Sequence, residues 1–233
     1  MLKDYFVKKM IGAFDDSYKF VNRVILDYVT TNPHTRTLRI LDIGCSDGSV
    51  TKKYLQDVTN YHVTGIDAQE TGGLLGGTYL NLDLELIPYP FDNESFDVVI
   101  LGQTIEHMLN KDNVLEESHR LLRTGGLFVC STENIASFDN ILSLLLGQEP
   151  HVQHTGSKIH THSFLSPHYM HKVVESTGNR YLHKNVNSYF GLLRLCAVNG
   201  FMDLKIKSFG NIARMFELLF PIYNRVLVVY GKK

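Results

Sequence analysis

The stretch LDIGCSDGS at residues 41–49 decides the fold expected of this chain. It follows a short apolar run at residues 38–43 and opens a helical pattern, which is the strand–turn–helix context of a nucleotide-binding loop. Gly44 permits a tight turn and a close approach of ligand to backbone, and Gly48 lets the helix begin against the strand. The spacing here is G-x-S-x-G, whereas a dinucleotide fingerprint needs G-x-G-x-x-G, so the loop does not favour a pyrophosphate ligand.

Strand and helix patterns alternate after this loop. Short apolar runs ending in Gly, Asp or Ser are typical of buried parallel strands, and they recur at residues 62–66, 96–101 and 127–130. Amphipathic helix patterns lie between them, at residues 50–58 and at 114–122, where Gly125-Gly126 ends the second. The tail reads as helices at 190–198 and 212–220 and strands at 201–209 and 225–230. The alternation predicts an α/β fold with a doubly wound, seven-stranded, mostly parallel sheet and an antiparallel last strand.

The chain begins with a helical segment and carries an insertion later on. Residues 7–14 and 21–29 each hold an apolar stripe at helical spacing, and Asn32-Pro33 ends the second helix. We expect residues 1–37 to form an N-terminal helical cover of a domain at 38–233. The alternation breaks after residue 132, where an apolar helix at 135–146 precedes a histidine-rich stretch. Residues 133–188 are therefore expected to form an inserted cap.

Composition and charge exclude several classes of protein. The 233 residues are 44% hydrophobic and 20% charged, enough for a buried core and unlike a disordered chain. Three scattered cysteines without a CxxC pair disfavour disulfides and structural zinc and favour a reducing, cytoplasmic compartment. The first residues mix charge with apolar side chains, so no signal peptide is expected, and no apolar run is long enough to span a membrane.

Charge is distributed unevenly along the chain. Residues 1–39 hold seven basic and four acidic side chains, and residues 201–233 hold six and two. The middle, residues 40–200, holds ten basic and eighteen acidic side chains. An acidic centre suits a small cationic ligand better than a nucleic acid, although solvated helix faces would give the same totals.

Two carboxylates follow strands near the glycine loop. Asp67 ends the second strand, where a carboxylate can accept hydrogen bonds from both hydroxyls of a ribose. Asp83 follows a third short strand, where it can accept from an adenine amino group. The structural alternative is that both side chains only cap turns. The position of Asp67 favours ligand binding more strongly than that of Asp83.

Five motifs in order resemble those of the class I S-adenosylmethionine-dependent methyltransferases. They are LDIGCSDG (41–48), GID (65–67), NLD (81–83), FDVVI (96–100) with QTIEH (103–107), and LRTGGLF (122–128). The resemblance covers residues 38–132 well and 160–233 loosely. It implies a Rossmann-like domain that binds S-adenosyl-L-methionine. The Glu-His pair after the fourth strand is similar to the branch containing quinone-biosynthesis and other small-molecule methyltransferases.

The resemblance also assigns roles to particular residues. Residues matching the methionine end of the cofactor site are Asp42, Gly44, Cys45 and Gly48. Asp67 would hold the ribose, Asp83 and Leu84 the adenine, and Gln103 the floor near the sulfonium. Ser46 replaces a glycine common in the family's loop, which is acceptable if its φ is negative.

Two features of the sequence bear on the methyl acceptor: motifs of nucleic-acid and amino-group methyltransferases are missing, and many histidines lie close together. The chain lacks the Pro-Pro-Tyr/Phe motif of amino-methylating enzymes after the fourth strand and a loop cysteine suited to attack a pyrimidine. Six histidines fall within residues 151–171, and with His107 they can supply a general base for a hydroxyl acceptor. His107 and His162 are the expected catalytic residues. The alternative for most of these histidines is a surface or packing role.

A metal site is considered and not assigned. Glu106 and His107 could bind a metal with His160 or His162, but RNA 3′-end methyltransferases with such a site have a Glu where this chain has Gln103. Glu106 is instead expected to cap the helix that begins near Asn110, with His107 facing the acceptor.

The function expected is S-adenosylmethionine-dependent O-methylation of a small metabolite or a sugar-containing intermediate, with residues 133–188 as the acceptor cap. The open alternatives are an RNA-directed or metal-assisted methyltransferase, an NAD-linked oxidoreductase, and a catalytically silent Rossmann-like binding protein. The partner expected is a small-molecule acceptor, nucleic acid is disfavoured, and the sequence does not define an oligomeric state.

Overall fold

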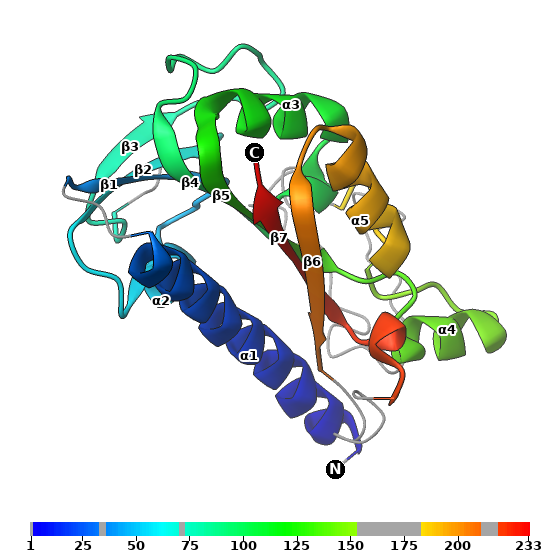
Figure 1. The fold of residues 1–233 in the computed structure, drawn as a ribbon. Helices are drawn as coiled ribbons and strands as arrows, with labels where there is room; N and C mark the ends of the chain where they lie inside the picture. The colour runs from blue at the N-terminus through cyan, green and yellow to red at the C-terminus, as the bar shows by residue number, and fades with distance from the viewer. Residues whose placement is uncertain (1, 33–35, 70–72, 153–182, 211–218) are drawn as a thin grey trace.

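The structure is a computed structural model that describes residues 2–32, 36–69, 73–152, 183–210 and 219–233, with side chains from Gly12 onward. Its helices and strands run through these ranges in the order expected of an α/β domain (Figure 1). The elements are α1 (Leu2–Thr31), β1 (Leu38–Ile43), α2 (Ser49–Leu55), β2 (Tyr61–Asp67), β3 (Thr78–Asn81), β4 (Phe96–Gly102), the 3₁₀ turn η1 (Ile105–His107), α3 (Lys111–Leu121), β5 (Leu122–Glu133), α4 (Phe138–Leu145), α5 (Tyr189–Val198), β6 (Met202–Phe209), the 3₁₀ turn η3 (Pro221–Tyr223) and β7 (Val226–Lys232).

The strands form a seven-stranded sheet in the order β3-β2-β1-β4-β5-β7-β6. Neighbouring strands from β3 to β5 pair in parallel, whereas β7 pairs antiparallel with both β5 and β6. The predicted α/β sheet with an antiparallel last strand is therefore confirmed. The order reverses between β1 and β4, and a reversal of this kind opens a crevice at the carboxyl ends of the strands.

Each face of the sheet has its own apolar core. Side chains of β1 alternate between them: Leu41 and Ile43 join the core with α3 and α5, whereas Leu38 and Ile40 join the core with α1 and α2. Figure 1 shows α1 on one side of the sheet and α3 and α5 on the other. Strands covered on both faces must be apolar along their length, which is why short continuous apolar runs predicted them correctly.

The N-terminal segment is one continuous helix, α1, and the expectation of two helices is wrong. The two apolar stripes are bridged by small residues, because Ala13 and Ser17 are buried at 2% and 0% exposure in line with Val21 and Ile25. Asn32 marks the end of the helix, since its backbone N–H and side-chain amide both donate to Tyr28 O. Within the described residues, no helix is both long enough and apolar enough to cross a bilayer.

One buried carboxylate, that of Asp97, links the segment before β1 and the strands β1, β4 and β5. Asp97, fully buried in β4, accepts two hydrogen bonds from Arg36, at 2.9 and 2.6 Å, and one from Arg39 N at 2.8 Å. Arg123 of β5 forms a further ion pair with it. Burial alone would raise the pKa of Asp97, but these cationic and N–H donors hold it below its usual range.

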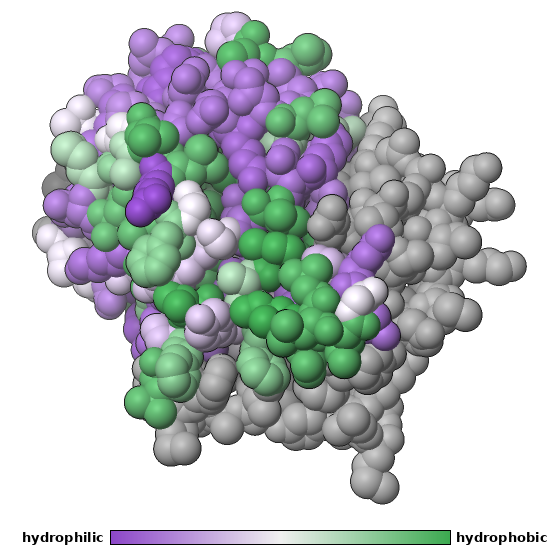
Figure 2. Space-filling model, turned by 90° about the vertical axis from the view of Figure 1, so that its right-hand side faces the viewer, coloured by the Kyte–Doolittle hydropathy of each residue, from purple (hydrophilic) through white to green (hydrophobic). Residues whose placement is uncertain are grey.

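Helix α4 buries its polar side chains and exposes its leucines. Asp139, Asn140 and Ser143 are buried, whereas Leu144, Leu145 and the following Leu146 are 55%, 78% and 53% exposed. Figure 2 faces the side of the molecule that carries α4 and α5 and shows apolar side chains gathered there. The inversion has a local cause: Asp139 pairs with the buried Arg225 guanidinium, so this face of α4 must turn inward.

Candidate functional site

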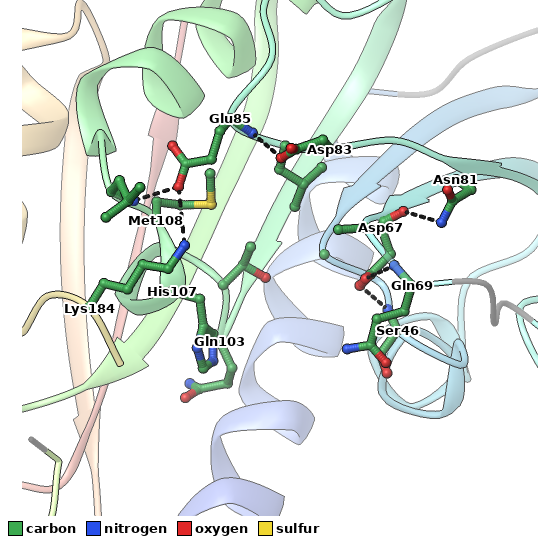
Figure 3. A pocket seen from close by; sticks show the side chains of 15 residues that line it. Ser46, Asp67, Gln69, Asn81, Asp83, Glu85, Gln103, His107, Met108 and Lys184 are labelled. Atoms are coloured by element: carbon green, nitrogen blue, oxygen red, sulfur yellow. Dashed lines mark hydrogen bonds and ion pairs between the residues drawn. The ribbon is translucent and has the colours of Figure 1, made fainter. Parts of the chain in front are cut away.

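A cavity of about 660 Å³ lies where the carboxyl ends of β1, β2 and β4 meet (Figure 3). Its position is the crevice that the reversal of strand order creates. The lining residues come from the loops after the first four strands and from one distant segment: Gly44, Ser46, Asp67, Ala68, Gln69, Asn81, Asp83, Leu84, Glu85, Gln103, Thr104, His107, Met108, Leu109 and Lys184.

The turn after β1 is built around Gly44. Its φ is +79°, and a Cβ at this position would lie 2.1 Å from Thr104 Oγ1, so no larger residue fits. Thr104 is held in turn by donating its hydroxyl to Ile43 O at 3.0 Å. Ser46 has a φ of +49°, so the condition under which serine fits the loop without strain is not met. Its N–H donates to Asp67 Oδ2 at 2.8 Å, which holds the serine in this left-handed conformation.

Asp67 lies at the centre of the cavity wall. It is 8% exposed, and its two carboxylate oxygens accept from Ser46 N at 2.8 Å and Gln69 N at 3.0 Å. A carboxylate offers about four lone-pair sites, so both oxygens can accept further hydrogen bonds from a bound ligand. Asp83 and the buried Leu84 line the same cavity, and Asp83 Oδ1 accepts from Glu85 N at 3.1 Å.

Three of the residues assigned to the cofactor lie behind the cavity wall. Asp42 is 3% exposed and accepts from Thr51 Oγ1 at 2.5 Å. Cys45 is 4% exposed, and burial raises the pKa of its thiol well above the ordinary range. Gly48, with a φ of +84°, leads into α2 and fits closely against Leu75. Contact between these residues and a cofactor stays a prediction.

The loop after β4 carries the Glu-His pair. Gln103 adopts a φ of +54° at the cavity wall, and η1 follows it. Glu106 is 3% exposed, and burial raises the pKa of its carboxyl to about 7. Glu106 Oε2 accepts a hydrogen bond from Thr132 Oγ1 at 2.9 Å. The Gln103 side-chain amide is oriented so that its oxygen and its nitrogen both have partners, and in this orientation Gln103 Nε2 donates to Glu106 Oε1 at 3.1 Å.

The role expected for Glu106 as a helix cap is wrong. Asn110 caps α3, because its side chain accepts from Asp112 N and Asn113 N. An asparagine directly before the helix is a preferred cap, so a more distant glutamate is not needed. Glu106 is therefore available for a role at the cavity, where His107 is a lining residue.

His183 lies beside Glu106 and His107 but was not among the residues predicted from the sequence. Lys184 N and Asn185 N donate to Glu106 O at 2.9 and 3.0 Å, which fixes this segment beside η1. The His107 and His183 rings lie 4.9 Å apart, centre to centre. His183 follows the histidine-rich stretch, but nothing local in the sequence indicates the backbone contact. His160 and His162 lie outside the described residues.

A buried ionic cluster adjoins this site. His151 lies 3.1 Å from Asp139 and 3.5 Å from Glu133, and Arg225 Nη1 donates to His151 Nε2 at 2.9 Å. Burial alone would raise the pKa of Glu133, but His151, His183 and Arg225 hold it at about 2. Glu133 is therefore a fixed negative charge beside His183, at 3.6 Å.

Comparison with known proteins agrees with the motifs. Residues 41–130 match the model of a family described as "Methyltransferase domain". Ubiquinone biosynthesis O-methyltransferase of Maricaulis maris is 34% identical over 109 residues, covering 43% of this chain and 42% of that protein. The enzyme with the same name from Roseobacter denitrificans is 27% identical over 190 residues, covering 75% and 68%. The chain spans 42% and 51% of the lengths of the Maricaulis maris and Ruegeria pomeroyi enzymes.

Solved structures share the fold over nearly the whole chain. A SAM-dependent methyltransferase from Archaeoglobus fulgidus has a TM-score of 0.58 at 16% identity and covers 93% of this chain and 94% of its own. The DszA carbon methyltransferase has a TM-score of 0.63 at 17% identity, covering 94% and 54%. The matched core at residues 41–130 is therefore similar to a methyltransferase domain, and these solved methyltransferases share the fold of the chain.

The Archaeoglobus fulgidus protein is named as SAM-dependent, and the cavity of this chain has a size and polar groups that fit S-adenosyl-L-methionine. The volume lies within the range of small-molecule sites, about 300–1,000 Å³. The Asp67 carboxylate keeps lone pairs that can accept from hydroxyl groups of a ligand, and the carboxylates of Asp67 and Asp83 suit a cationic ligand.

Proposed function

We propose that this chain transfers a methyl group from S-adenosylmethionine to an oxygen atom of a small acceptor, either a metabolite or a sugar-containing intermediate. The arrangement that carries the proposal is a single cavity with Asp67 and Asp83 on one wall and Gln103 and His107 on another (Figure 3). The Maricaulis maris relative, whose name gives an O-methyltransferase, supports oxygen as the accepting atom.

Binding orients the cofactor along this cavity. Asp67 accepts from the ribose hydroxyls and Asp83 with Leu84 meets the adenine, while the Gly44 turn brings its backbone close to the methionine end. Asp42, Cys45 and Gly48 support that turn from behind. Gln103 forms the floor near the sulfonium. Most of the rate enhancement then comes from aligning the acceptor oxygen with the S–CH₃ bond.

Proton removal belongs to the other end of the cavity. When bound, S-adenosylmethionine supplies an electrophilic methyl group on a sulfonium. A hydroxyl oxygen attacks well only as it loses its proton. His107, which lines the cavity, takes this proton, and His162 of the proposed acceptor cap at 133–188 is the second candidate base. The new C–O bond forms as the C–S bond breaks, and the sulfur keeps the electron pair. Helix α1, the described part of the expected cover at 1–37, packs with α2 on one face of the sheet.

Ligand binding separates this proposal from its rivals. S-adenosylhomocysteine and NAD⁺ are titrated separately into the full chain by calorimetry. We expect S-adenosylhomocysteine to bind and NAD⁺ not to bind. Binding of NAD⁺ would favour an oxidoreductase, and binding of neither would favour a silent Rossmann-like protein.

Turnover of His107 and His162 variants tests proton removal. With radiolabelled S-adenosylmethionine and a panel of hydroxylated acceptors, we expect His107→Ala and His162→Ala each to lower turnover by about 10²–10⁴-fold. S-adenosylhomocysteine affinity should hardly change, because His107 lines the cavity on the wall away from Asp67. Unchanged turnover in both variants would contradict a histidine base, and proximity alone would then carry the reaction.

A further inference from the structure

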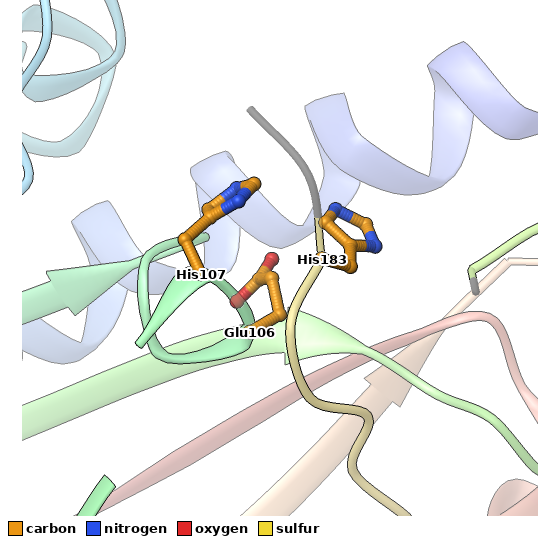
Figure 4. Close-up of side chains that lie close together, drawn as sticks. All are labelled: Glu106, His107 and His183. Carbon is orange, nitrogen blue, oxygen red and sulfur yellow. The ribbon is translucent and has the colours of Figure 1, made fainter. Parts of the chain in front are cut away.

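We propose that Glu106, His107 and His183 bind a divalent transition-metal ion, Zn²⁺ by the chemistry of the donors, at the acceptor end of the cavity. One ligand atom from each of the three residues lies within 4.8 Å of the others. Figure 4 shows the Glu106 carboxylate between the two imidazole rings. Ligand atoms about 2.0–2.2 Å from a common ion lie closer together than this, so small side-chain rotations complete the site.

The hydrogen bonding of His183 prepares its other nitrogen for a metal. His183 Nδ1 lies 2.8 Å from Val152 O, and a carbonyl oxygen can only accept, so Nδ1 carries the proton. The lone pair of the neutral ring is therefore on Nε2. Glu133 Oε2 lies 3.6 Å from the same Nδ1 and strengthens this tautomer. Metal-binding histidines usually donate their second N–H to a carbonyl or carboxylate in this way.

Glu106 has the environment of a metal-binding carboxylate. Thr132 and Gln103 each donate one hydrogen bond to a different carboxylate oxygen, and these two bonds fix its orientation. Across the described ranges, no lysine or arginine forms an ion pair with Glu106. A buried carboxylate needs a proton or a positive charge close by, and a divalent ion supplies that charge.

Two imidazoles and one carboxylate form a donor set found in catalytic zinc sites, which keep a fourth position open. The open position here faces the cavity, because His107 and Gln103 both line it. Resting on the proposed function, the ion's role is to bind the acceptor hydroxyl oxygen and lower its pKa. With the ion bound, the hydroxyl proton leaves to solvent, and His107 contributes to proton removal by holding the ion, so His107→Ala is expected to lower turnover in either case.

Titration with Zn²⁺ alone tests the site. The full chain is treated with a chelator, dialysed and titrated by calorimetry. We expect one Zn²⁺ site that Glu106→Gln and His183→Ala each weaken by at least about tenfold. His119→Ala is the matched control, because His119 packs edge-on against Phe201 outside the cluster, and it should leave Zn²⁺ affinity unchanged.

S-adenosylhomocysteine binding by the same variants distinguishes a variant that has not folded from one that has lost only the Zn²⁺ site. Retained binding shows that Glu106→Gln and His183→Ala are folded, so their loss of Zn²⁺ affinity supports the site. Zn²⁺ affinity equal to that of the unmodified chain in either variant would overturn the proposal, as would no Zn²⁺ binding by the unmodified chain. Failure of the unmodified chain to bind S-adenosylhomocysteine would overturn the proposed function and leave the Zn²⁺ result standing.

Discussion

Asp67 combines two tasks in one carboxylate: it supports the loop after β1 and faces the cavity. We expect Asp67→Ala to weaken S-adenosylhomocysteine binding by about 1.5–3 kcal/mol, the usual loss for hydrogen bonds to a charged acceptor. Calorimetry measures the affinity, and ligand-free melting checks the fold. Asp57→Ala, at an exposed position just after α2, is the control and should change neither. Unchanged affinity in a folded Asp67→Ala protein would remove Asp67 from the site.

Asp42 makes stability depend on pH. Burial raises the pKa of its carboxyl to about 7; the Thr51 hydroxyl opposes this rise and the charge of Asp67 adds to it. Because the folded pKa lies above the ordinary value, the contribution to stability is complete below about pH 4 and is lost as the pH rises through 7.

Asp42→Asn removes this titration and keeps an acceptor for Thr51. Between pH 4 and pH 8 we expect the unmodified chain to lose up to about 4 kcal/mol of unfolding free energy relative to the variant. Urea unfolding of both proteins at several pH values measures the difference. Parallel stability curves would show that Asp42 does not titrate in this range.

The positions of site residues that directly follow a strand could be predicted from the sequence, whereas the positions of residues that depend on packing between distant segments could not. The motif around Gly44 and the carboxylate of Asp67 follow strands directly, so their common edge of the sheet could be inferred from the sequence. Asp42 lies behind the cavity wall because its side chain is on the face of β1 that packs next to Thr51, and the sequence does not indicate this face. His183 is brought to Glu106 by backbone hydrogen bonds from Lys184 and Asn185, which are 78 and 79 residues away from Glu106 in the chain, and no local pattern encodes such contacts.

At the scale of elements, Asp97 links the segment before β1 to β4 and β5. We expect Asp97→Ala to lower the unfolding free energy by about 3–5 kcal/mol, because the substitution removes the buried carboxylate that pairs with Arg36 and Arg123. Chemical denaturation measures the change. The exposed Asp92, in the loop before β4, is the control, and Asp92→Ala should stay within about 0.5 kcal/mol. A similar effect of both substitutions would contradict a specific role for Asp97.

Element types were more predictable than element boundaries. The apolar runs identified the buried strands, but the glycine pair at 125–126 was expected to end a helix and instead lies inside β5. Helix α3 ends at Leu121, and β5 begins at the next residue and pairs with β4 from Leu122. The two glycines lie in the irregular part of β5, between Leu122 and Leu127, where Gly125 adopts a φ of +73°.

At the scale of the whole molecule, β7 holds the antiparallel side of the sheet together. It lies between β5 and β6, and Val226, Leu227, Val228 and Val229 are each 0% exposed. Burying four such side chains contributes about 6–12 kcal/mol, comparable with the net stability of a domain. We expect removal of residues 226–233 to abolish cooperative unfolding in calorimetry. A soluble truncated protein with a sharp transition would contradict this role.

The position of β7 also determines when the sheet can close during synthesis. β6 leaves the ribosome before β7 but touches the rest of the sheet only through it. The nascent chain therefore holds β6 with an unpaired edge until the residues of β7 have been translated. An open strand edge invites pairing with other chains, so β6 is prone to aggregation until β7 pairs with it.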